Sequence, residues 1–531
     1  MPSSKKLMVV LGNQLFPWSE LKAQFGDDLP GVRVYMAEDW ELCTFQKHHQ
    51  QKIVLFLAAM RSYADELREH GVTVQYTRLD SLEGPELRKK YETRLNEYID
   101  GTKSLDLEEL ILWEIEDKWF ERRIADFAAS RGLKLTVLPS PMFLTPREEF
   151  DDYLATTSGG NKPFMAKFYE RQRKRLDIMV DGDGKPDGGQ WSFDGDNRKK
   201  LPKKVDVPET DWAKPTDHVE AVKTLVADRF ADHPGELDSF WLPTTRRQAL
   251  VWLRQFLEER FANFGPYEDA ISDRDPVLFH SVMSPIVNLG LLTPEEIVDR
   301  AIEHAEELGI ADSESGDASK LGGKIPINSL EGFVRQMIGW REFIRGVYRQ
   351  YEREDETKNF WGHTRKLKPC WYDGTTGLRP LDDTIRRANR YGWTHHIERL
   401  MVMGNLFNLC EVQPKDAYDW FMCMFVDSSD WVMSPNVYGM GLMSDGGVFA
   451  TKPYICGSNY LVKMSDCYTK SEDWCETMDG LYWRFVDNHR DFFGSNARMS
   501  MMLGTLNRMD AKKRETRFAL AEAFIDRVTT G

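Results

Sequence analysis

The sequence has few cysteines and no paired cysteine motif. Its 531 residues include seven Cys, an odd number, and no CxxC spacing occurs. A disulfide framework is typical of short secreted chains with an even set of closely spaced cysteines, so we interpret these residues as reduced intracellular thiols.

Long apolar runs are also missing. The apolar part of the opening segment MPSSKKLMVVLGNQL is too short for a signal peptide, and no later stretch approaches the roughly 20 residues that cross a bilayer. The sequence therefore predicts a soluble, cytosolic protein with no membrane partner.

The chain has fewer basic than acidic residues, so its net charge is −15 and its pI is about 5.4. A polyanionic partner would therefore have to meet a local basic surface. The candidate clusters are Arg171–Arg175, Arg198–Lys204, Arg345–Arg353 and Arg386–Arg390. Any single cluster of this kind is more often a solvated helix face or loop.

Glycine-rich nucleotide motifs are absent as well: neither a GxGxxG nor a Walker A sequence occurs, which leaves a nicotinamide or P-loop function without support. The first 138 residues instead alternate strands with helices. Strand-like runs lie at 6–12, 32–36, 72–76, 110–113 and 133–138, and helical spacing lies at 44–70, 84–99 and 119–131. This alternation predicts an α/β domain with a parallel sheet over residues 1–138. Ligands of such sheets bind beyond the strand ends, so Gly12–Gln14 and Glu38 form a candidate pocket.

The composition changes after residue 138. Residues 139–234 are rich in Gly, Asp, Lys and Pro, with helical potential mainly at Phe164–Ile178, and predict a long surface connector. Residues 235–531 show almost only helical spacing and predict an all-α domain. Apolar residues make up 41% of the chain and aromatic residues 12%, enough for a large core that is rich in groups able to stack on flat ligands.

One expected helical hairpin, from Tyr391 to Asp427, concentrates polar groups. His396 and Arg399 are three residues apart on one helix face, and Trp420 lies in the second helix. Such a group suggests a functional site, with satisfied core side chains as an equal alternative.

Two further stretches have functional and structural interpretations. The run HSVMSP places the hydroxyls of Ser281 and Ser284 just before a helix, where free N–H groups favour phosphate, although an ordinary helix cap explains the pattern as well. In the Leu330–Tyr351 helix, Gln336 and Trp340 could line a cavity for a base, although a Met and aromatic stripe is usually core.

Taken in series, these stretches resemble the photolyase and cryptochrome flavoproteins. The matching runs, in chain order, are LGNQL, MAEDW, HHQQKI, AMRSYADEL, HSVMSP, EGFVRQMIGWREFIRG, THHIERLMVMGN, DWVMSPNVYGM and TKPYICGSNYLVKMSD. The chain is most similar to the bacterial branch that contains the prokaryotic (6-4) photolyases and the cryptochrome-like proteins that hold an iron–sulfur cluster.

The resemblance implies an α/β Rossmann-like antenna domain at the N-terminus and an all-α C-terminal domain that holds a U-shaped FAD. By position, the FAD phosphates would be contacted by Tyr267, His280, Ser281 and Ser284. Arg399 and Asp427 would form an ion pair beside the isoalloxazine ring, since a buried carboxylate and a buried guanidinium are tolerable only together.

The resemblance also implies an enzyme, a photolyase that acts on UV-damaged DNA in the light. Excited reduced FAD would pass an electron to a flipped-out (6-4) pyrimidine photoproduct. His396, with a near-neutral pKa, would donate the proton and His395 would support it, because adjacent helical positions point about 100° apart. Trp420 would be the first electron carrier in flavin photoreduction. The lesion cavity would be lined by Gln336, Met337 and Trp340.

Further cofactors follow from the same resemblance. A 6,7-dimethyl-8-ribityllumazine antenna is implied near Gly12, Asn13, Gln14 and Glu38, although Asn13 replaces an Asp common in the family. A divalent cation such as Mg²⁺ is implied at Asp269.

The iron–sulfur cluster of the family is not expected here. A [4Fe–4S] cluster needs four thiolates or close substitutes. Pro380 stands at the first of the four positions, and Cys467 lacks the second cysteine of a CxxC pair. Cys370, Cys456 and Cys475 are the other cysteines that could converge on it.

Two alternatives remain open: a cryptochrome-like blue-light photoreceptor without repair activity, and a cyclobutane-dimer photolyase. The intact His395–His396 pair and the basic connector favour (6-4) repair. We further expect a monomer that is cytoplasmic, and nucleoid-associated when it is bound to DNA.

Overall fold

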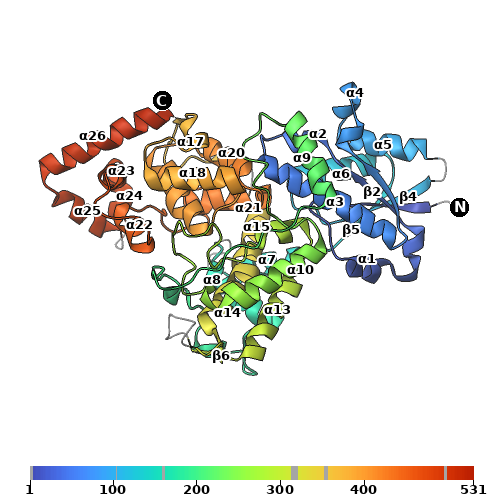
Figure 1. Cartoon of the computed structure of the whole chain (residues 1–531), viewed down its shortest axis with the longest axis horizontal. Helices are drawn as coiled ribbons and strands as arrows, with labels where there is room; N and C mark the ends of the chain where they lie inside the picture. Colours follow the sequence, from blue (N-terminus) through green and yellow to red (C-terminus); the bar gives the residue numbers. More distant parts are fainter. Residues whose placement is uncertain (1–3, 103–104, 158–161, 313–320, 352–356, 496–498) are drawn as a thin grey trace.

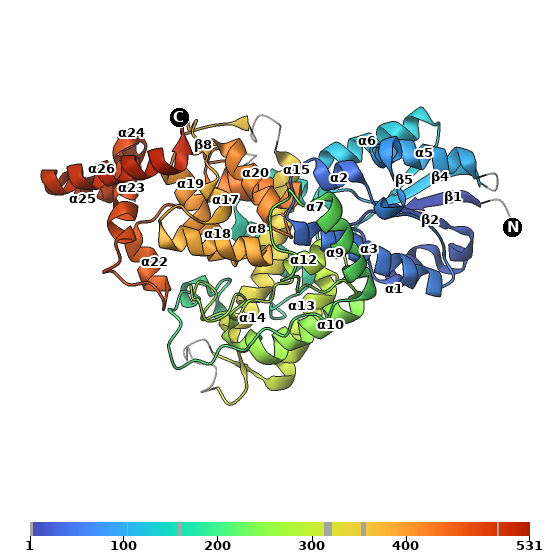
Figure 2. The ribbon, with the colours of Figure 1, turned by 45° about the horizontal axis from the view of Figure 1, so that its top comes forward.

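A computed structural model of the chain describes residues 4–102, 105–157, 162–312, 321–351, 357–495 and 499–531. An α/β part lies at one end of the molecule and a larger helical part occupies the rest (Figures 1 and 2). No described helix is both long enough and apolar enough to span a bilayer.

Five parallel strands form the sheet of the N-terminal part. They are β1 (Ser4–Val9), β2 (Arg33–Ala37), β3 (Thr73–Thr77), β4 (Leu105–Trp113) and β5 (Lys134–Leu138). Their order is β3-β2-β1-β4-β5, with Leu7 paired to Arg33 on one side and to Leu110 on the other. This order places the reversal of winding between β1 and β4, where ligands of such sheets bind.

Successive side chains of β1 enter two different cores. Met8 and Val10 are buried in the large core that includes α3 (Gln50–Glu69). Leu7 and Val9 are buried in a second cluster with side chains of α5 (Tyr91–Gly101) and α6 (Lys118–Ser130). The unbroken apolar run in the sequence thus reflects a strand that is covered on both faces.

The connector over residues 139–234 contains more helix than the sequence indicates. The expected helix near Phe164–Ile178 is α8 (Met165–Leu176). Two helices were missed, α7 (Arg147–Ala155) and α9 (Asp217–Arg229). Their charged faces hide the periodicity, and each is stabilised by packing, α9 against α3 and α7 against α15. The domain boundaries at 138 and 234 stay a prediction.

The C-terminal part is helical, as expected. Its longer elements are α10 (Arg246–Gln255), α13 (Pro294–Leu308), α14 (Ile327–Val334), α15 (Glu342–Gln350), α18 (Arg379–Tyr391), α20 (Pro414–Met424), α23 (Trp474–Asn488), α25 (Ser500–Asn507) and α26 (Ala511–Val528). Shorter helices are α11 (Phe261–Phe264), α12 (Ser284–Leu289), α17 (Cys370–Asp373), α19 (Asn405–Leu409), α21 (Asp430–Ser434), α22 (Ser458–Met464) and α24 (Arg490–Ser495). Two-residue strands pair as β6 (Ile310–Ala311) with β7 (Ile325–Pro326), and β8 (Lys366–Leu367) with β9 (Thr529–Thr530).

Several helices of this part contain π-helical turns. These are η5 (Phe256–Arg260), η7 (Arg335–Arg341), η8 (Glu398–Gly404) and η9 (Pro435–Gly441). η8 and η9 meet at two glycines: a Cβ added to Gly404 would lie 3.4 Å from the Cα atom of Gly441. Such bulges often mark functional sites, and here they bring two backbones close beside a cavity.

Candidate functional site

The expected ion pair between Arg399 and Asp427 is present. Nη1 and Nη2 of Arg399 donate to the two carboxylate oxygens at 2.9 and 3.1 Å. The hydroxyl of Ser284 donates to the same carboxylate at 2.6 Å, and Nδ2 of Asn288 donates to the Asp427 carbonyl at 3.0 Å. The guanidinium also lies 4.0 Å from the ring centroid of Phe425. The buried charges therefore compensate each other in a fixed geometry.

A cavity of about 550 Å³ lies beside this ion pair, between η8, η9 and α20. His396, Arg399 and Asn436 supply its polar side chains. The remaining lining is Leu400, Gly404, Phe421, Val432, Met433, Val437, Met440, Gly441 and Leu442. Apolar walls with a few convergent polar groups suit a flat ring that has one polar edge.

The two adjacent histidines face different surroundings, as their helical spacing predicts. His396 is exposed to the cavity. His395 is buried, stacks on His280 at a centroid distance of 5.0 Å, and places its Nε2 atom 3.5 Å from Oε2 of Glu398. The two side chains therefore cannot perform the same task.

The expected near-neutral pKa of His396 is wrong for this structure. Desolvation by the surrounding protein and the positive charge of Arg399 lower the pKa of His396 to about 4. Burial and neighbouring positive charge also hold the pKa of His395 well below its ordinary value. Both imidazoles are therefore neutral near pH 7.

The residues expected at the FAD phosphates lie in three places. His280 and Ser281 line one cavity of about 250 Å³, together with Arg260. Ser284 is instead engaged by the ion pair. Tyr267 is buried in a separate small apolar cluster. The structure thus brings His280 and Ser281 together and leaves Tyr267 apart from them.

Several buried ring nitrogens near the ion pair lack hydrogen-bond partners among the described residues, and a bound flavin could supply them. Nε2 of His280 and both ring nitrogens of His395 are buried and make no hydrogen bond within the described part of the chain. Buried polar atoms ordinarily have partners. A ligand with ring nitrogens, carbonyls and hydroxyls would supply them, and the neighbouring cavity offers apolar walls for its ring.

The residues expected around the flipped base all lie on η7. Nε2 of Gln336 donates to Oε1 of Glu268 at 2.6 Å. Met337 is buried and Trp340 is half-buried. These three are not among the residues that line the cavity of His396. The structure therefore does not place them around the same space as the expected proton donor.

Glu268, which lies next to this helix and precedes Asp269, was not expected from the sequence. Burial raises the pKa of Glu268 to about 7, an effect that Arg335 partly offsets. Burial also raises the pKa of Asp269 to about 6, and Nε of Arg198 lies 4.0 Å from its carboxylate. The Mg²⁺ site at Asp269 stays a prediction.

A second, larger cavity of about 1160 Å³ lies between the C-terminal edge of the sheet and the helical part. Gly12, Asn13 and Glu38 line it, as expected from the ends of β1 and β2. Gln14 is not among its lining residues, and its part in antenna binding stays a prediction. Its amide donates to the Trp113 carbonyl at 3.2 Å and thereby ties the loop to β4.

Charged groups in this larger cavity were missed as well. Lys52, on the buried face of α3, donates to the carbonyl and the hydroxyl of Ser428 at 2.8 Å each. Burial lowers the pKa of Lys52 to about 8. Burial also raises the pKa of Asp117 to about 8, an effect to which Asp430 adds. A single lysine on an apolar helix face gives no pattern that sequence reasoning could have used.

Trp420 is fully buried and lies one residue from the cavity wall. Its Nε1 atom donates to the Trp371 carbonyl at 2.7 Å, and its ring lies 5.5 Å from that of Phe421, which lines the cavity. Phe407 contacts Trp420 at 5.7 Å and stacks on Trp371 at 4.8 Å. The contact of Trp420 with Phe407 and Trp371 was not expected from the sequence.

All seven cysteines are free thiols, and those considered for a cluster have different neighbours. Sγ of Cys370 lies near the Val528 carbonyl, and Sγ of Cys475 near the Thr469 carbonyl. Within the described ranges, one group of close metal-ligating side chains is found, Asp273, Asp466 and Cys467, and it contains a single cysteine. The absence of an iron–sulfur cluster stays a prediction.

In three of the four basic clusters, at least one arginine pairs with a carboxylate of the protein. Arg171 pairs with Glu149 at 2.7 Å, Arg345 pairs with Glu116 at 2.9 Å, and Arg387 pairs with Glu398. Residues 352 and 353 lie outside the described residues. The segment after η4 (Asp194–Asp196) has exposed lysines at 200, 203 and 204, and Lys174, Arg175, Arg386 and Arg390 of the other clusters are exposed as well.

Comparison with known proteins agrees with this fold. A bacterial class III photolyase from Agrobacterium tumefaciens superposes with a TM-score of 0.58 at 17% identity, over 99% of this chain and 98% of that chain. An archaeal photolyase from Sulfolobus tokodaii with two FAD molecules superposes with a TM-score of 0.51 at 13% identity, over 98% and 100%. The α/β sheet domain and the helical domain thus form the photolyase fold.

Sequence comparison then gives the family. The family model "Deoxyribodipyrimidine photo-lyase-related protein" matches residues 8–242, and the model "FAD binding domain of DNA photolyase" matches residues 333–473. The "(6-4) photolyase" of Agrobacterium fabrum is 31% identical over 529 residues, which cover 98% of this chain and 99% of that protein. The chain belongs to the photolyase and cryptochrome family, in the branch of the bacterial (6-4) photolyases, and its helical part includes the FAD-binding domain of that family.

Proposed function

We propose that this protein uses light to repair (6-4) pyrimidine photoproducts in UV-damaged DNA. The observation that carries the proposal is the cavity lined by His396 and Arg399, at whose border Asp427 pairs with the Arg399 guanidinium. The likeness to a named (6-4) photolyase over nearly the whole chain supports the same substrate.

FAD, when bound, would supply the light-excited electron donor. The guanidinium of Arg399 would hold the polar edge of its ring and stabilise negative charge there, and Asp427 would keep that guanidinium in place. Ser284 fixes the carboxylate in turn through its 2.6 Å hydrogen bond. The ion pair and this hydrogen bond hold the three side chains in a fixed arrangement.

His396 would deliver a proton from a ring nitrogen to the lesion. With its pKa near 4, the resting imidazole is neutral. Negative charge that a ligand brings into the cavity would raise this pKa and favour the protonated form. His395 would act behind it as a positioning residue, since it is stacked on His280 and lies beside Glu398.

The shape and charge of two further surfaces support the remaining partners. The cavity lined by Gly12, Asn13 and Glu38 would hold the lumazine antenna. The exposed lysines 200, 203 and 204 would contact DNA phosphates near the flipped base, whose extrusion costs a few kcal/mol. A monomer is sufficient for this arrangement, because one chain supplies every residue named.

The test is blue-light repair of an oligonucleotide with one (6-4) photoproduct, by the wild type, His396→Ala and His218→Ala. His218, a surface histidine paired with Asp65 at 2.7 Å, is the matched control. We expect repair by the wild type and His218→Ala, and at least a hundredfold slower repair by His396→Ala with FAD still bound.

Two results would contradict the proposal. Normal flavin photoreduction without wild-type repair of either kind of lesion would indicate a photoreceptor. Repair of cyclobutane dimers alone, unaffected by His396→Ala, would indicate a cyclobutane-dimer photolyase.

A further inference from the structure

Two loops of the helical part, far apart in the sequence, are tied together by backbone hydrogen bonds. Ile271 donates its N–H to the Met464 carbonyl at 3.0 Å, and Asp466 donates its N–H to the Ile271 carbonyl at 3.2 Å. The two strands of this contact form a parallel bridge between Ile271 and Ser465. The chain therefore fixes the loop around residue 273 against the loop that follows α22.

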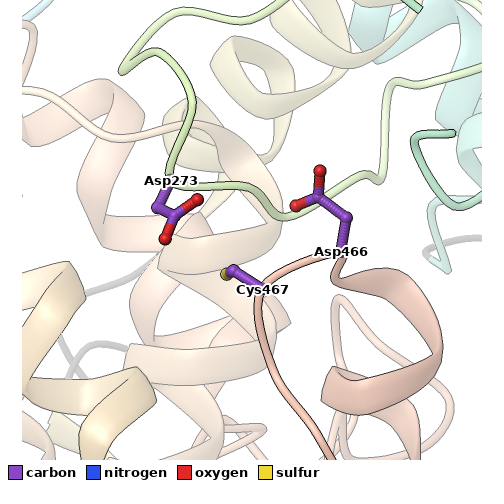
Figure 3. A group of neighbouring side chains, drawn as sticks. All are labelled: Asp273, Asp466 and Cys467. Atoms are coloured by element: carbon purple, nitrogen blue, oxygen red, sulfur yellow. The ribbon is translucent and has the colours of Figure 1, made fainter. Parts of the chain in front are cut away.

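This contact gathers three side chains with metal-ligating atoms. Asp273, Asp466 and Cys467 each offer one such atom, and these atoms all lie within 4.8 Å of one another. The three side chains surround a common space between the two loops (Figure 3). Asp273 is exposed, whereas Asp466 and Cys467 are largely covered.

One carboxylate oxygen of Asp466 is buried without a hydrogen-bond partner among the described residues. Its side chain is 8% exposed. Oδ2 pairs with Nε of Arg274 at 2.9 Å, but Oδ1 is buried and makes no hydrogen bond within the described residues. One oxygen of this carboxylate faces the side of Asp273 (Figure 3). A buried carboxylate oxygen next to a second carboxylate and a thiol is unfavourable unless a cation binds between them.

We propose that Asp273, Asp466 and Cys467 bind one divalent cation of the zinc class. A thiolate with carboxylate oxygens selects such an ion over Mg²⁺ and Ca²⁺, which prefer ligand sets made of oxygen alone. Ligand atoms around a tetrahedral zinc ion lie roughly 3.3–3.7 Å apart, given bonds of about 2.0–2.3 Å. Closing from within 4.8 Å to that spacing requires small rotations of the side chains.

Neighbouring groups are arranged to support these ligands. The hydroxyl of Ser465 lies 3.0 Å from Sγ of Cys467 and can donate to the thiolate. Arg274 orients Asp466 and is itself held by the Val205 carbonyl at 2.8 Å. Second partners of this kind fix ligand orientation in metal sites. Three protein ligands leave the fourth tetrahedral position to water or another ligand.

The bound ion would join the two loops more firmly than the two backbone hydrogen bonds do. It would tie the segment before α12 to the start of the C-terminal helices. The site is independent of the proposed repair reaction, because none of its residues lines the cavity of His396, the cavity of His280 and Ser281, or the larger cavity at the sheet edge.

The experiment adds Co²⁺ to the metal-free, full-length protein and records the difference spectrum against a sample with Mg²⁺, which cancels the flavin bands. We expect one equivalent of Co²⁺ to give a thiolate-to-cobalt charge-transfer band in the near ultraviolet. Cys467→Ser would abolish the band, and Asp273→Asn would weaken Co²⁺ binding at least about tenfold. Cys370→Ser, at a partly exposed thiol elsewhere, is the matched control and would keep the band.

Zn²⁺ added to the metal-free wild type should also raise the melting temperature, and it should not do so in Cys467→Ser. This second measurement applies even if one variant is poorly folded. The proposal is overturned if no saturable charge-transfer band forms, if the band survives in Cys467→Ser, or if the purified protein contains iron and sulfide in cluster proportions bound through Cys467. None of these results depends on repair activity.

Discussion

Substituting Asp427 by Asn tests the energetic role of the ion pair. The change keeps the size of the side chain and removes its charge, which leaves the guanidinium of Arg399 unpaired. The side chains of the pair are 16% and 5% exposed, so solvent replaces little of the lost interaction. Removing one member of a buried pair costs about 3–5 kcal/mol. Arg399 keeps its hydrogen bond to the Thr394 carbonyl at 2.8 Å, so we expect the lower end, about 3 kcal/mol.

The assay is urea unfolding followed by circular dichroism, with the free energy taken from the midpoint and slope. The double variant Arg399→Met/Asp427→Asn should recover at least half of the loss, because it removes both buried charges. Asp232→Asn, which breaks an exposed pair with Lys47, is the control and should leave the midpoint unchanged. An Asp427→Asn variant as stable as the wild type, or a double variant less stable than either single one, would refute the reasoning.

Three further predictions address pH, the cavity and DNA. The free energy of unfolding should fall as the pH decreases from about 6.5 to 4. Burial lowers the folded-state pKa of His49, His363 and His396 to about 4, so the unfolded chain binds more protons in this range. Melting temperatures measured across the range check the sign. Gly404→Leu should abolish flavin retention by forcing η8 from η9. Gly504→Leu should retain flavin, because a Cβ there would lie 3.8 Å from the flexible Arg508 side chain; equal flavin-to-protein ratios in the two variants would contradict this. Replacing lysines 200, 203 and 204 by Ala should weaken DNA binding and reduce the slope of log affinity against log salt by up to roughly 2–3, and an unchanged slope would show that DNA binds elsewhere.

The centre of the sheet could be predicted from the sequence because β1 is an apolar run buried on both faces, with Met8 and Leu7 entering opposite cores. The helices α7 and α9 could not, because charged residues mask their periodicity and packing against other elements stabilises them. The local sequence pattern therefore predicted the elements that are themselves strongly apolar, and not the charged helices.

The site divides in a similar way. Helical spacing and family resemblance led to Arg399, Asp427 and His396, which the structure brings to one cavity or its border. Gln14 differs from its neighbours in the loop, because Gly12 and Asn13 line the larger cavity while its own amide donates to the Trp113 carbonyl of β4. Lys52 was missed because its importance arises only where α3 meets the helical part. The lowered pKa of His396 likewise depends on desolvation, which no sequence pattern reports.

The central claim is that the helical part holds FAD beside Arg399 and Asp427. The most direct measurement is the absorption spectrum of the purified wild type and of Arg399→Leu after incubation with FAD and removal of free flavin. The account predicts one tightly bound FAD per wild-type chain, reduced under blue light with an added electron donor, and much weaker retention in Arg399→Leu. A wild-type protein that stays colourless after this treatment, or a variant that binds FAD equally well with an unchanged spectrum, would contradict the claim.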